Sequence, residues 1–282
     1  MQPISFGREL ASILLKVGGV ILTIVLVTVL VGVLSFGYTS VSDGTCNIAV
    51  LPIEGIIMPF GNGIQYPEFT TTPHDVRDFL TLVAEDNVSI EGIMFDINSP
   101  GGTPVAAEDI ARQIRDLDLP NVALIGDVGA SGGYMIASAA DRIFASAMSD
   151  VGSIGVTMSY VEESEKNKEE GLTYVPLTTG KFKDAGDINK PLSDEDREYF
   201  QTQLDAVKDE FVRLVAENRG MSIDEVNLLA DGSTMIGRQA VEKKLIDQVG
   251  DRNDVRAYFA EKLGRDIDQI TFCEYSAPLE LI

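Results

Sequence analysis

Histidine is almost absent from this chain, which has one, His74, among its 282 residues. A serine hydrolase of the α/β-hydrolase type has its histidine after its serine and its acid in the sequence. His74 lies instead in the first third of the chain, in a stretch with helical spacing beside Asp75 and Arg77. We therefore expect His74 to be a solvated helix residue, and any nucleophilic serine here needs a base of another kind.

Basic residues and cysteines are also scarce. Lysine and arginine number 22 against 44 aspartates and glutamates, and the net charge of −22 argues against binding nucleic acid through a basic face. No C-x-x-C or Cys/His pattern occurs, so we expect no metal site and no cofactor. The two cysteines, Cys46 and Cys273, could form a disulfide in an oxidising compartment, but the sequence leaves their proximity open.

Charged residues are missing from positions 17–42. As a helix, the apolar run 17–36 would span roughly 30 Å, the thickness of a bilayer's hydrocarbon core. A cleaved signal peptide would have a shorter apolar region. Arg8 and Lys16 precede the run and favour a cytoplasmic N-terminus. We predict four parts: a cytoplasmic segment (1–16), a transmembrane anchor (17–36), a linker (37–46) and one extracytoplasmic domain (47–282).

Strands, glycine-rich turns and helices alternate through the middle of the chain. Segments 47–57 and 90–102 are predicted strands, and Pro104 suits the first turn of a helix that follows the second of them. The apolar strand 121–128 again leads into a glycine-rich turn and a short helix. This repeated order of strand, turn and helix predicts an α/β fold with a parallel sheet. A further apolar strand is expected at 172–175.

The C-terminal third is predicted to be helical. Apolar residues recur there at spacings of four and three, which indicates one long helix with an apolar stripe, and we expect Phe200 and Phe211 to make core or oligomer contacts. The residues of this stripe are Phe200, Leu204, Val207, Phe211 and Leu214. Ser193 is a candidate N-cap for that helix, and Ser222 with Glu225 matches a capping box at the start of another. Two shorter helices are expected at 239–246 and 255–263.

The turn GASGG, residues 129–133, fits the G-x-S-x-G pattern of a nucleophile elbow. Ser131 would lie at a strand-to-helix turn, where the free N–H groups of the helix N-terminus can stabilise an oxyanion. Gly132 and Gly133 would let a substrate backbone approach without meeting a Cβ atom. The alternative is that Ser131 only caps the short helix.

Without a suitable histidine, the base available to a serine is a lysine, whose pKa is lowered by burial. Most basic residues lie in charged stretches typical of solvated faces, such as 162–171. The segment 176–187 differs, because it is rich in glycine and threonine and carries Lys181 and Lys183 two positions apart. In an extended segment both would point the same way, so spacing alone does not choose between them. Either could also be a solvated loop charge.

Four blocks of the sequence occur in the order found in the signal peptide peptidase A family, which this chain resembles. They are INSPGG (97–102), GASGGYMIASAADRIFAS (129–146), GSIGV (152–156) and TGKFKDAG (179–186). The resemblance extends over roughly residues 47–265. It implies a membrane-anchored serine peptidase with a Ser–Lys dyad. It also implies a ClpP/crotonase-like α/β fold of repeated β-β-α units, with one N-terminal transmembrane helix.

Matched residue by residue, the resemblance implies that Ser131 is the nucleophile. Lys183 corresponds to the general base, because the family's lysine comes three residues after a glycine, as it does here. Ser153 corresponds to a serine that hydrogen-bonds the lysine amine and orients it. The backbone N–H groups of Gly102 and Gly132 correspond to the oxyanion hole.

The resemblance further implies an assembly and a substrate. Short members form homo-oligomeric rings whose active sites face a shared interior near the membrane, and the serine and lysine can come from adjacent protomers. The implied function is endoproteolysis of remnant signal peptides at the cell membrane, with the bilayer contacted through residues 17–36. Three alternatives remain: a related Ser–Lys peptidase that cuts a membrane scaffolding protein, a crotonase-like acyl-CoA enzyme, and a non-catalytic membrane scaffold of the same fold.

Overall fold

The computed structural model describes residues 16–27, 46–60, 70–85 and 90–275. The chain divides into two units, Met1–Ser40 and Val41–Ile282. In the first unit, residues 16–27 form a helix. Among the described residues, no helix combines the length and apolarity needed to cross a bilayer. Most of the predicted N-terminal segment, anchor and linker (1–46) lies outside the described residues.

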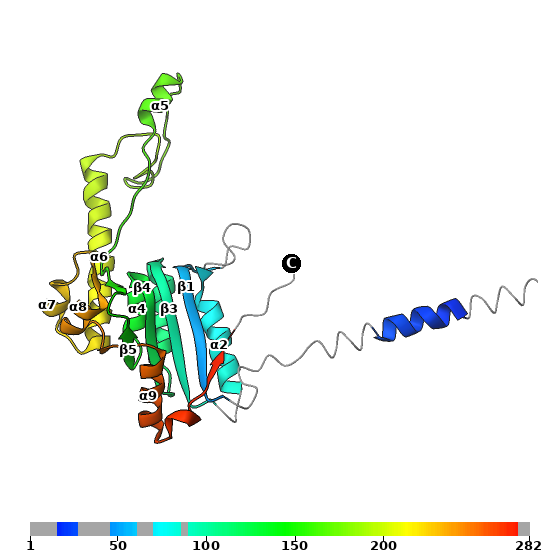
Figure 1. The fold of residues 1–282 in the computed structure, drawn as a ribbon. Helices are drawn as coiled ribbons and strands as arrows, with labels where there is room; N and C mark the ends of the chain where they lie inside the picture. Colours follow the sequence, from blue (N-terminus) through cyan, green and yellow to red (C-terminus); the bar gives the residue numbers. More distant parts are fainter. Residues whose placement is uncertain (1–15, 28–45, 61–69, 86–89, 276–282) are drawn as a thin grey trace, which may run out of the picture. The chain divides into compact units, whose positions relative to one another are not determined.

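The second unit is built on a mostly parallel sheet (Figure 1). In spatial order its main strands are β2 (Thr70–Thr71), β1 (Ile48–Ile57), β3 (Gly92–Gly102), β4 (Asn121–Ala130), β5 (Arg142–Ala145) and β8 (Gln248–Val249). Three further strands join it: β6 (Asp150–Gly152) beside β4, β7 (Thr234–Ile236) antiparallel to β6, and β9 (Phe272–Glu274) parallel to β1. The predicted α/β architecture with a parallel sheet is confirmed.

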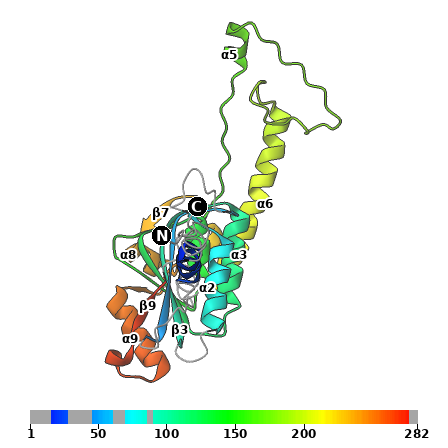
Figure 2. The same cartoon turned by 90° about the vertical axis from the view of Figure 1, so that its right-hand side faces the viewer.

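Helices cover both faces of this sheet (Figure 2). The helices of the second unit are α2 (Pro73–Glu85), α3 (Pro104–Arg115), α4 (Gly132–Ser138), α5 (Ser164–Glu169), α6 (Asp194–Arg219), α7 (Ile223–Asn227), α8 (Gly237–Glu242) and α9 (Arg252–Leu263). The order β1–β2–α2 forms one β-β-α unit, and β3–α3 and β4–α4 follow with one strand each. Because the strands are parallel, the turns after β3 and β4 meet at one edge of the sheet.

Strand β1 shows why both faces of the sheet are covered. Ala49, Leu51 and Ile53 belong to the larger core, which includes residues of α2, α3, α4 and α6. Ile48 and Val50, which alternate with them, belong to the smaller core beneath α9. None of the five is more than 3% exposed. Apolar residues at successive positions of a strand point to opposite faces, so this run is stable only when both faces are buried.

The two predicted serine caps are confirmed, while the helices expected to start at 239 and 255 start at Gly237 and Arg252. Ser193 caps α6, since its side chain accepts a hydrogen bond from the N–H of Asp196 at 3.1 Å. Ser222 and Glu225 form the predicted capping box of α7. These short side-chain bonds satisfy N–H groups that the first turn of a helix leaves without a partner.

Residues 158–193, here called the extension, reach beyond the sheet together with the first half of α6 (Figures 1 and 2). The strand predicted at 172–175 is wrong, because no described strand pairs with this stretch. An isolated apolar segment cannot form a hydrogen-bonded ladder, so its composition alone does not make it a strand. Its side chains are largely exposed. Exposed apolar residues of the extension include Val161, Leu172, Val175 and Leu177, the last with 95% of its surface exposed.

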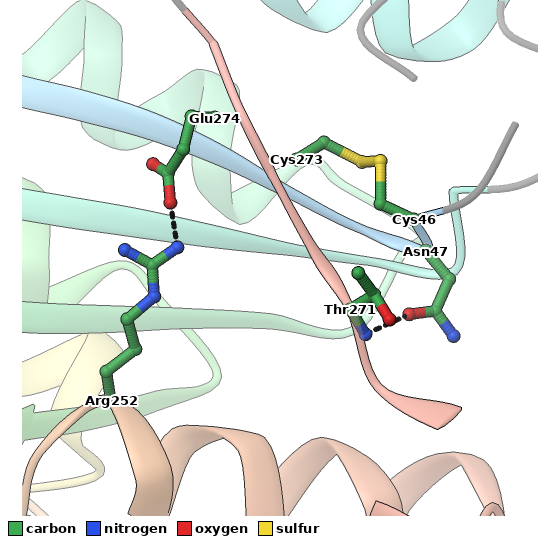
Figure 3. Close-up of a disulfide and its surroundings, with 6 residues drawn as sticks. All are labelled: Cys46, Asn47, Arg252, Thr271, Cys273 and Glu274. Carbon is green, nitrogen blue, oxygen red and sulfur yellow. Dashed lines mark hydrogen bonds and ion pairs between the residues drawn. A yellow bond between two sulfur atoms is a disulfide. The ribbon is translucent and has the colours of Figure 1, made fainter. Parts of the chain in front are cut away.

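Cys46 and Cys273 form a disulfide, which settles a question that the sequence leaves open (Figure 3). Strand β9 lies parallel to β1, with Cys273 opposite Ala49. Beside the disulfide, the side-chain oxygen of Asn47 accepts the N–H of Thr271 at 2.9 Å. The two cysteines are 227 positions apart, so the bond closes almost the entire second unit into one covalent loop.

Reducing this disulfide is expected to lower the free energy of unfolding by roughly 4–5 kcal/mol, because an open chain regains the loop-closure entropy of a long loop. Urea denaturation of the full chain, with and without dithiothreitol, measures the change. The Cys46→Ser/Cys273→Ser variant should have the lower midpoint and no response to reductant. An unchanged midpoint for the parent protein under full reduction would contradict the expectation.

Candidate active site

Ser131 lies between β4 and α4 with φ 52° and ψ −122°, a conformation that residues with side chains rarely adopt. Its N–H donates to the carbonyl oxygen of Gly152 at 2.8 Å, and its carbonyl oxygen accepts the N–H of Met135 at 2.9 Å. Its side chain makes no capping hydrogen bond to α4, so the capping interpretation is not supported. The strained backbone is held by hydrogen bonds of both its N–H and its carbonyl oxygen, and the hydroxyl does not cap the helix. This arrangement has the form of a nucleophile elbow.

Ser153 follows β6 in the way that Ser131 follows β4. Ala130 is paired with Gly152, so the two serines leave neighbouring parallel strands at the same level, both with φ 52°. The Ser153 hydroxyl donates to the carbonyl oxygen of Gly232 at 3.0 Å. With its proton engaged there, the hydroxyl oxygen can still accept a hydrogen bond from an amine.

Gly102 and Gly132 bring two backbone N–H groups together. The N–H of Thr103 donates to the carbonyl oxygen of Ile57 in β1 at 2.9 Å. Because successive N–H groups of a strand point to opposite sides, the N–H of Gly102 points away from β1. A Cβ atom built on Gly132 would lie 3.3 Å from the nitrogen of Gly102, so the predicted oxyanion donors are neighbours.

The turn at Gly102 has no room for a side chain, since a Cβ atom there would collide with the carbonyl oxygen of Ile57. We expect Gly102→Ala to displace this N–H and reduce kcat at least about 10²-fold, the usual cost of losing one oxyanion donor. Gly126→Ala is the matched control, because its Cβ atom would meet nothing nearer than 3.6 Å. Equal kcat values for the two variants and the parent would exclude Gly102 as a donor.

A cavity of about 730 Å³ joins these groups. Ser131, Ser153, Gly102 and Gly132 all line it, so four of the five residues predicted for the site lie around one space. Helix α6 also lines the cavity, through Leu204, Val207 and Phe211 among others, and Met135 adds a further apolar side chain. The cavity therefore offers a serine and backbone donors together with apolar side chains.

Lys183, the fifth predicted residue, does not line this cavity. It is exposed in the turn at 181–186 of the extension, where neighbouring Phe182 stacks on Tyr199 of α6 with ring centroids 4.5 Å apart. Within the described residues, no carboxylate forms an ion pair with Lys183, whereas Lys181 pairs with Glu195. Spacing alone left these two lysines equivalent, the family resemblance favoured Lys183, and the structure distinguishes them by their partners.

Asp184, directly after Lys183, forms an ion pair with Lys190 at 3.0 Å. The hydrogen bond from Lys190 to this carboxylate raises the pKa of Lys190. Asp184 is thus engaged by another lysine of the extension.

Three charged residues of the cavity were missed by the sequence analysis: Asp205 and Lys208 on α6, and Asp231 in the loop before β7. The hydrogen bond from the side chain of Ser233 holds the pKa of Asp231 below its usual value. The sequence signal that could have found Lys208 is its position four residues after Leu204, because that spacing places it on the same helix face as the predicted apolar stripe. His74 lies elsewhere, exposed on α2 with Nδ1 3.1 Å from Asp78.

Comparison with known proteins agrees with this geometry. The family model described as peptidase family S49 matches residues 113–265, more than half of the chain and a range that includes Ser131 and Lys183. The chain belongs to peptidase family S49. It is a serine-type peptidase, and the resemblance to signal peptide peptidase A is confirmed.

Three relatives illustrate the similarity. A putative protease of Methanocaldococcus jannaschii is 35% identical over 69% of this chain and 62% of its own length. The putative signal peptide peptidase SppA of Enterococcus faecium is 31% identical over 84% of this chain and 69% of its own length. Protease 4 of Haemophilus influenzae is 28% identical over 73% of this chain and 33% of its own length. The chain thus spans less than two thirds of the first relative and one third of the last.

Proposed function

We propose that this S49 peptidase is a membrane-anchored endopeptidase in which Ser131 attacks the peptide bond and Lys183 of an adjacent copy accepts its proton. One observation carries the proposal. The cavity holds a serine, two backbone donors and an orienting hydroxyl, while Lys183 lies exposed on the extension without an ion pair among the described residues. A lysine presented outward in this way can complete the site of a neighbouring copy.

The chemistry follows from these groups. Ser131 Oγ adds to the carbonyl carbon as the neutral amine of Lys183 takes its proton, and the N–H groups of Gly102 and Gly132 stabilise the oxyanion. The ammonium then protonates the leaving amine, which gives an acyl-enzyme. Water, activated by the same amine, releases the second product and restores the serine. Ser153 accepts a hydrogen bond from the amine and orients it.

The extension supports an oligomer as the working form. Its apolar side chains Val161, Val175 and Leu177 are each more than 70% exposed, which is costly for a surface that faces only water. Contact with a neighbouring copy would cover them and carry Lys183 to that copy's cavity. We propose a closed ring, because a heterologous contact of this kind repeats from copy to copy until it closes.

Apolar peptides are the proposed substrates. Leu204, Val207 and Phe211 line the cavity beside Ser131 and suit apolar side chains. A relative is named as a putative signal peptide peptidase, which favours signal peptides left in the membrane. The test is hydrolysis of a synthetic signal peptide by the full chain in detergent. Turnover supports the proposal, and failure to cleave any signal peptide would oppose it.

A second candidate substrate is a protein scaffold. Capsid assembly protease C of phage lambda is 29% identical over 73% of this chain and 47% of its own length. Its name connects that relative to capsid assembly, which favours a protein of a larger assembly as a second candidate substrate here. Comparing kcat/KM for a signal peptide with that for a coiled-coil scaffold protein separates the two candidates.

The disulfide supports an extracytoplasmic location for the peptidase domain. Disulfides persist in oxidising compartments and are rare where thiols are kept reduced. Cys46 and Cys273 are both below 8% exposed and are paired, so the folded domain suits the outer side of the cell membrane. An N-terminus in the cytoplasm and one crossing by residues 17–36 would produce this arrangement.

A further inference from the structure

The cavity beside Ser131 contains a lysine that the proposed Ser–Lys mechanism does not use. Lys208 is half-buried on α6 and lines the same cavity as Ser131 and Gly132. On its own helix it lies four residues after Leu204 and three before Phe211, both of which also line the cavity. Its side chain therefore shares the face of α6 that borders the reacting groups.

Lys208 differs from the other described lysines without an ion-pair partner because it is half-buried, whereas Lys16, Lys183, Lys243 and Lys262 are exposed. Five lysines in the described ranges form ion pairs: Lys166, Lys168, Lys181, Lys190 and Lys244. Within the same ranges, no carboxylate forms an ion pair with Lys208, although acidic residues outnumber basic residues two to one in the sequence. A half-buried ammonium without an acceptor is unusual in so acidic a protein.

The two carboxylates that share the cavity have donors of their own. Asp205 accepts a hydrogen bond from Gln201 at 2.8 Å. Asp231 accepts the backbone N–H of Ser233 at 2.9 Å and its hydroxyl at 2.6 Å. After the hydrogen bonds from Ser233, the positive charge of Lys208 also lowers the pKa of Asp231, but among the described residues no hydrogen bond or ion pair engages the amine of Lys208.

The direction of the side chain argues against a role in the chemistry. Side chains of a helix lean toward its N-terminus, so we expect the amine of Lys208 to lie toward the first half of α6 and away from Phe211. Phe211 is 3% exposed, whereas Val207 is 37% exposed, so this direction leads toward the open end of the cavity. An amine there reaches the substrate at a distance from the scissile bond.

We propose that Lys208 is a specificity-determining residue that binds a carboxylate of the peptide substrate several residues from the cleaved bond. The inference rests on the proposed peptidase function of this cavity. The carboxylate belongs to an acidic side chain or to the free C-terminus of the peptide. In the second case, an earlier endopeptidase cleavage must supply the substrate, because such a cleavage creates the new carboxylate.

The test uses the full chain in detergent and one apolar peptide in matched versions. Glutamate or glutamine is introduced at each position outside the cleaved bond, and each peptide is made with a free or an amidated C-terminus. The parent protein should prefer the charged version about tenfold in kcat/KM, the value of one charge-assisted hydrogen bond. The Glu/Gln arm identifies a side-chain carboxylate, and the acid/amide arm identifies the C-terminus.

Variants then connect the preference to this lysine. Lys208→Gln should abolish it, Lys208→Arg should keep most of it, and Lys208→Glu should reverse it in favour of lysine peptides. Lys243→Gln, a change at an exposed lysine outside the cavity, should behave as the parent protein does. No preference in the parent protein, or the same preference in Lys208→Gln, would overturn the proposal. A preference for basic peptides that Asp205→Asn removes would assign the site to the acids instead.

Failure of the peptidase proposal remains distinguishable. Fluorescence anisotropy of labelled peptides on the Ser131→Ala protein measures binding without turnover, and Lys208→Gln in that background should weaken only the charged peptides. Equal loss of kcat for charged and uncharged peptides in Lys208→Gln would place the lysine in the chemistry and overturn a recognition role. Turnover by Ser131→Ala at the parent rate would contradict the proposed nucleophile. The anisotropy measurements would still test, independently of turnover, whether Lys208 binds the charged peptides.

Discussion

Replacing Ser131 by alanine is expected to lower kcat/KM for an apolar peptide by at least about 10⁴-fold, because removal of a nucleophile eliminates the covalent route. The side chain makes no capping hydrogen bond to α4, and alanine meets the same backbone strain at φ 52°. The variant should therefore fold as the parent protein does. Steady-state hydrolysis and a thermal melt, measured on the same preparation, test both parts.

Ser222→Ala is the matched control for this variant. Ser222 caps α7 through the N–H of Glu225, so its loss should cost about 1 kcal/mol of stability and leave peptide hydrolysis unchanged. The Ser131→Ala variant should thus lose activity and keep its stability, whereas the Ser222→Ala variant should lose stability and keep its activity. Residual hydrolysis by Ser131→Ala above about one per cent of the parent rate would mean that another group attacks the substrate.

Lys183→Ala is expected to lower kcat/KM by a similar factor, because the serine then has no base and the leaving amine has no acid. Lys181→Ala should remain active, because Lys181 forms an ion pair with Glu195 and has no part in the proposed chemistry. If Lys181→Ala is inactive and Lys183→Ala is active, the base has been assigned to the wrong lysine.

A mixing experiment tests whether the dyad forms between copies. Ser131→Ala and Lys183→Ala, each inactive alone, are expressed together so that they assemble in mixed rings. Random assortment should pair an intact serine with an intact lysine at about a quarter of the sites, and activity should return to that level. A dyad formed within one chain predicts no recovery at all.

The sequence predicted those features that depend on a few neighbouring residues. The strand-to-helix turn at Ser131 and the caps at Ser193 and Ser222 are all present, because each follows from local backbone chemistry. The short blocks likewise contain Ser131, Gly102 and Gly132, which the structure brings to one cavity. Contacts that join distant segments were less accessible. Cys46 and Cys273 are 227 positions apart, so their pairing required the parallel alignment of β9 with β1.

The long helix α6 shows the same limit in its side chains. Phe200 and Phe211 of its apolar stripe were predicted to make core or oligomer contacts, and Phe211 and Leu214 are buried. Leu204 and Val207 instead line the open cavity, because the first half of α6 extends beyond the sheet. Periodicity identifies the apolar face of a helix but not what that face contacts. The spacing of Lys208 from Leu204 likewise indicates a shared helix face, but not that this face lines a cavity.

Covalent trapping of Ser131 tests the central claim most directly. The full chain is treated with a fluorophosphonate, which reacts with activated serines, and the modified residue is located by mass spectrometry. We predict one labelled site, Ser131, with labelling that becomes faster as pH rises because only the neutral amine can take the proton. Labelling should be lost in Ser131→Ala and slowed in Lys183→Ala. A label on another serine, or equal labelling of the parent protein and Lys183→Ala, would contradict the account.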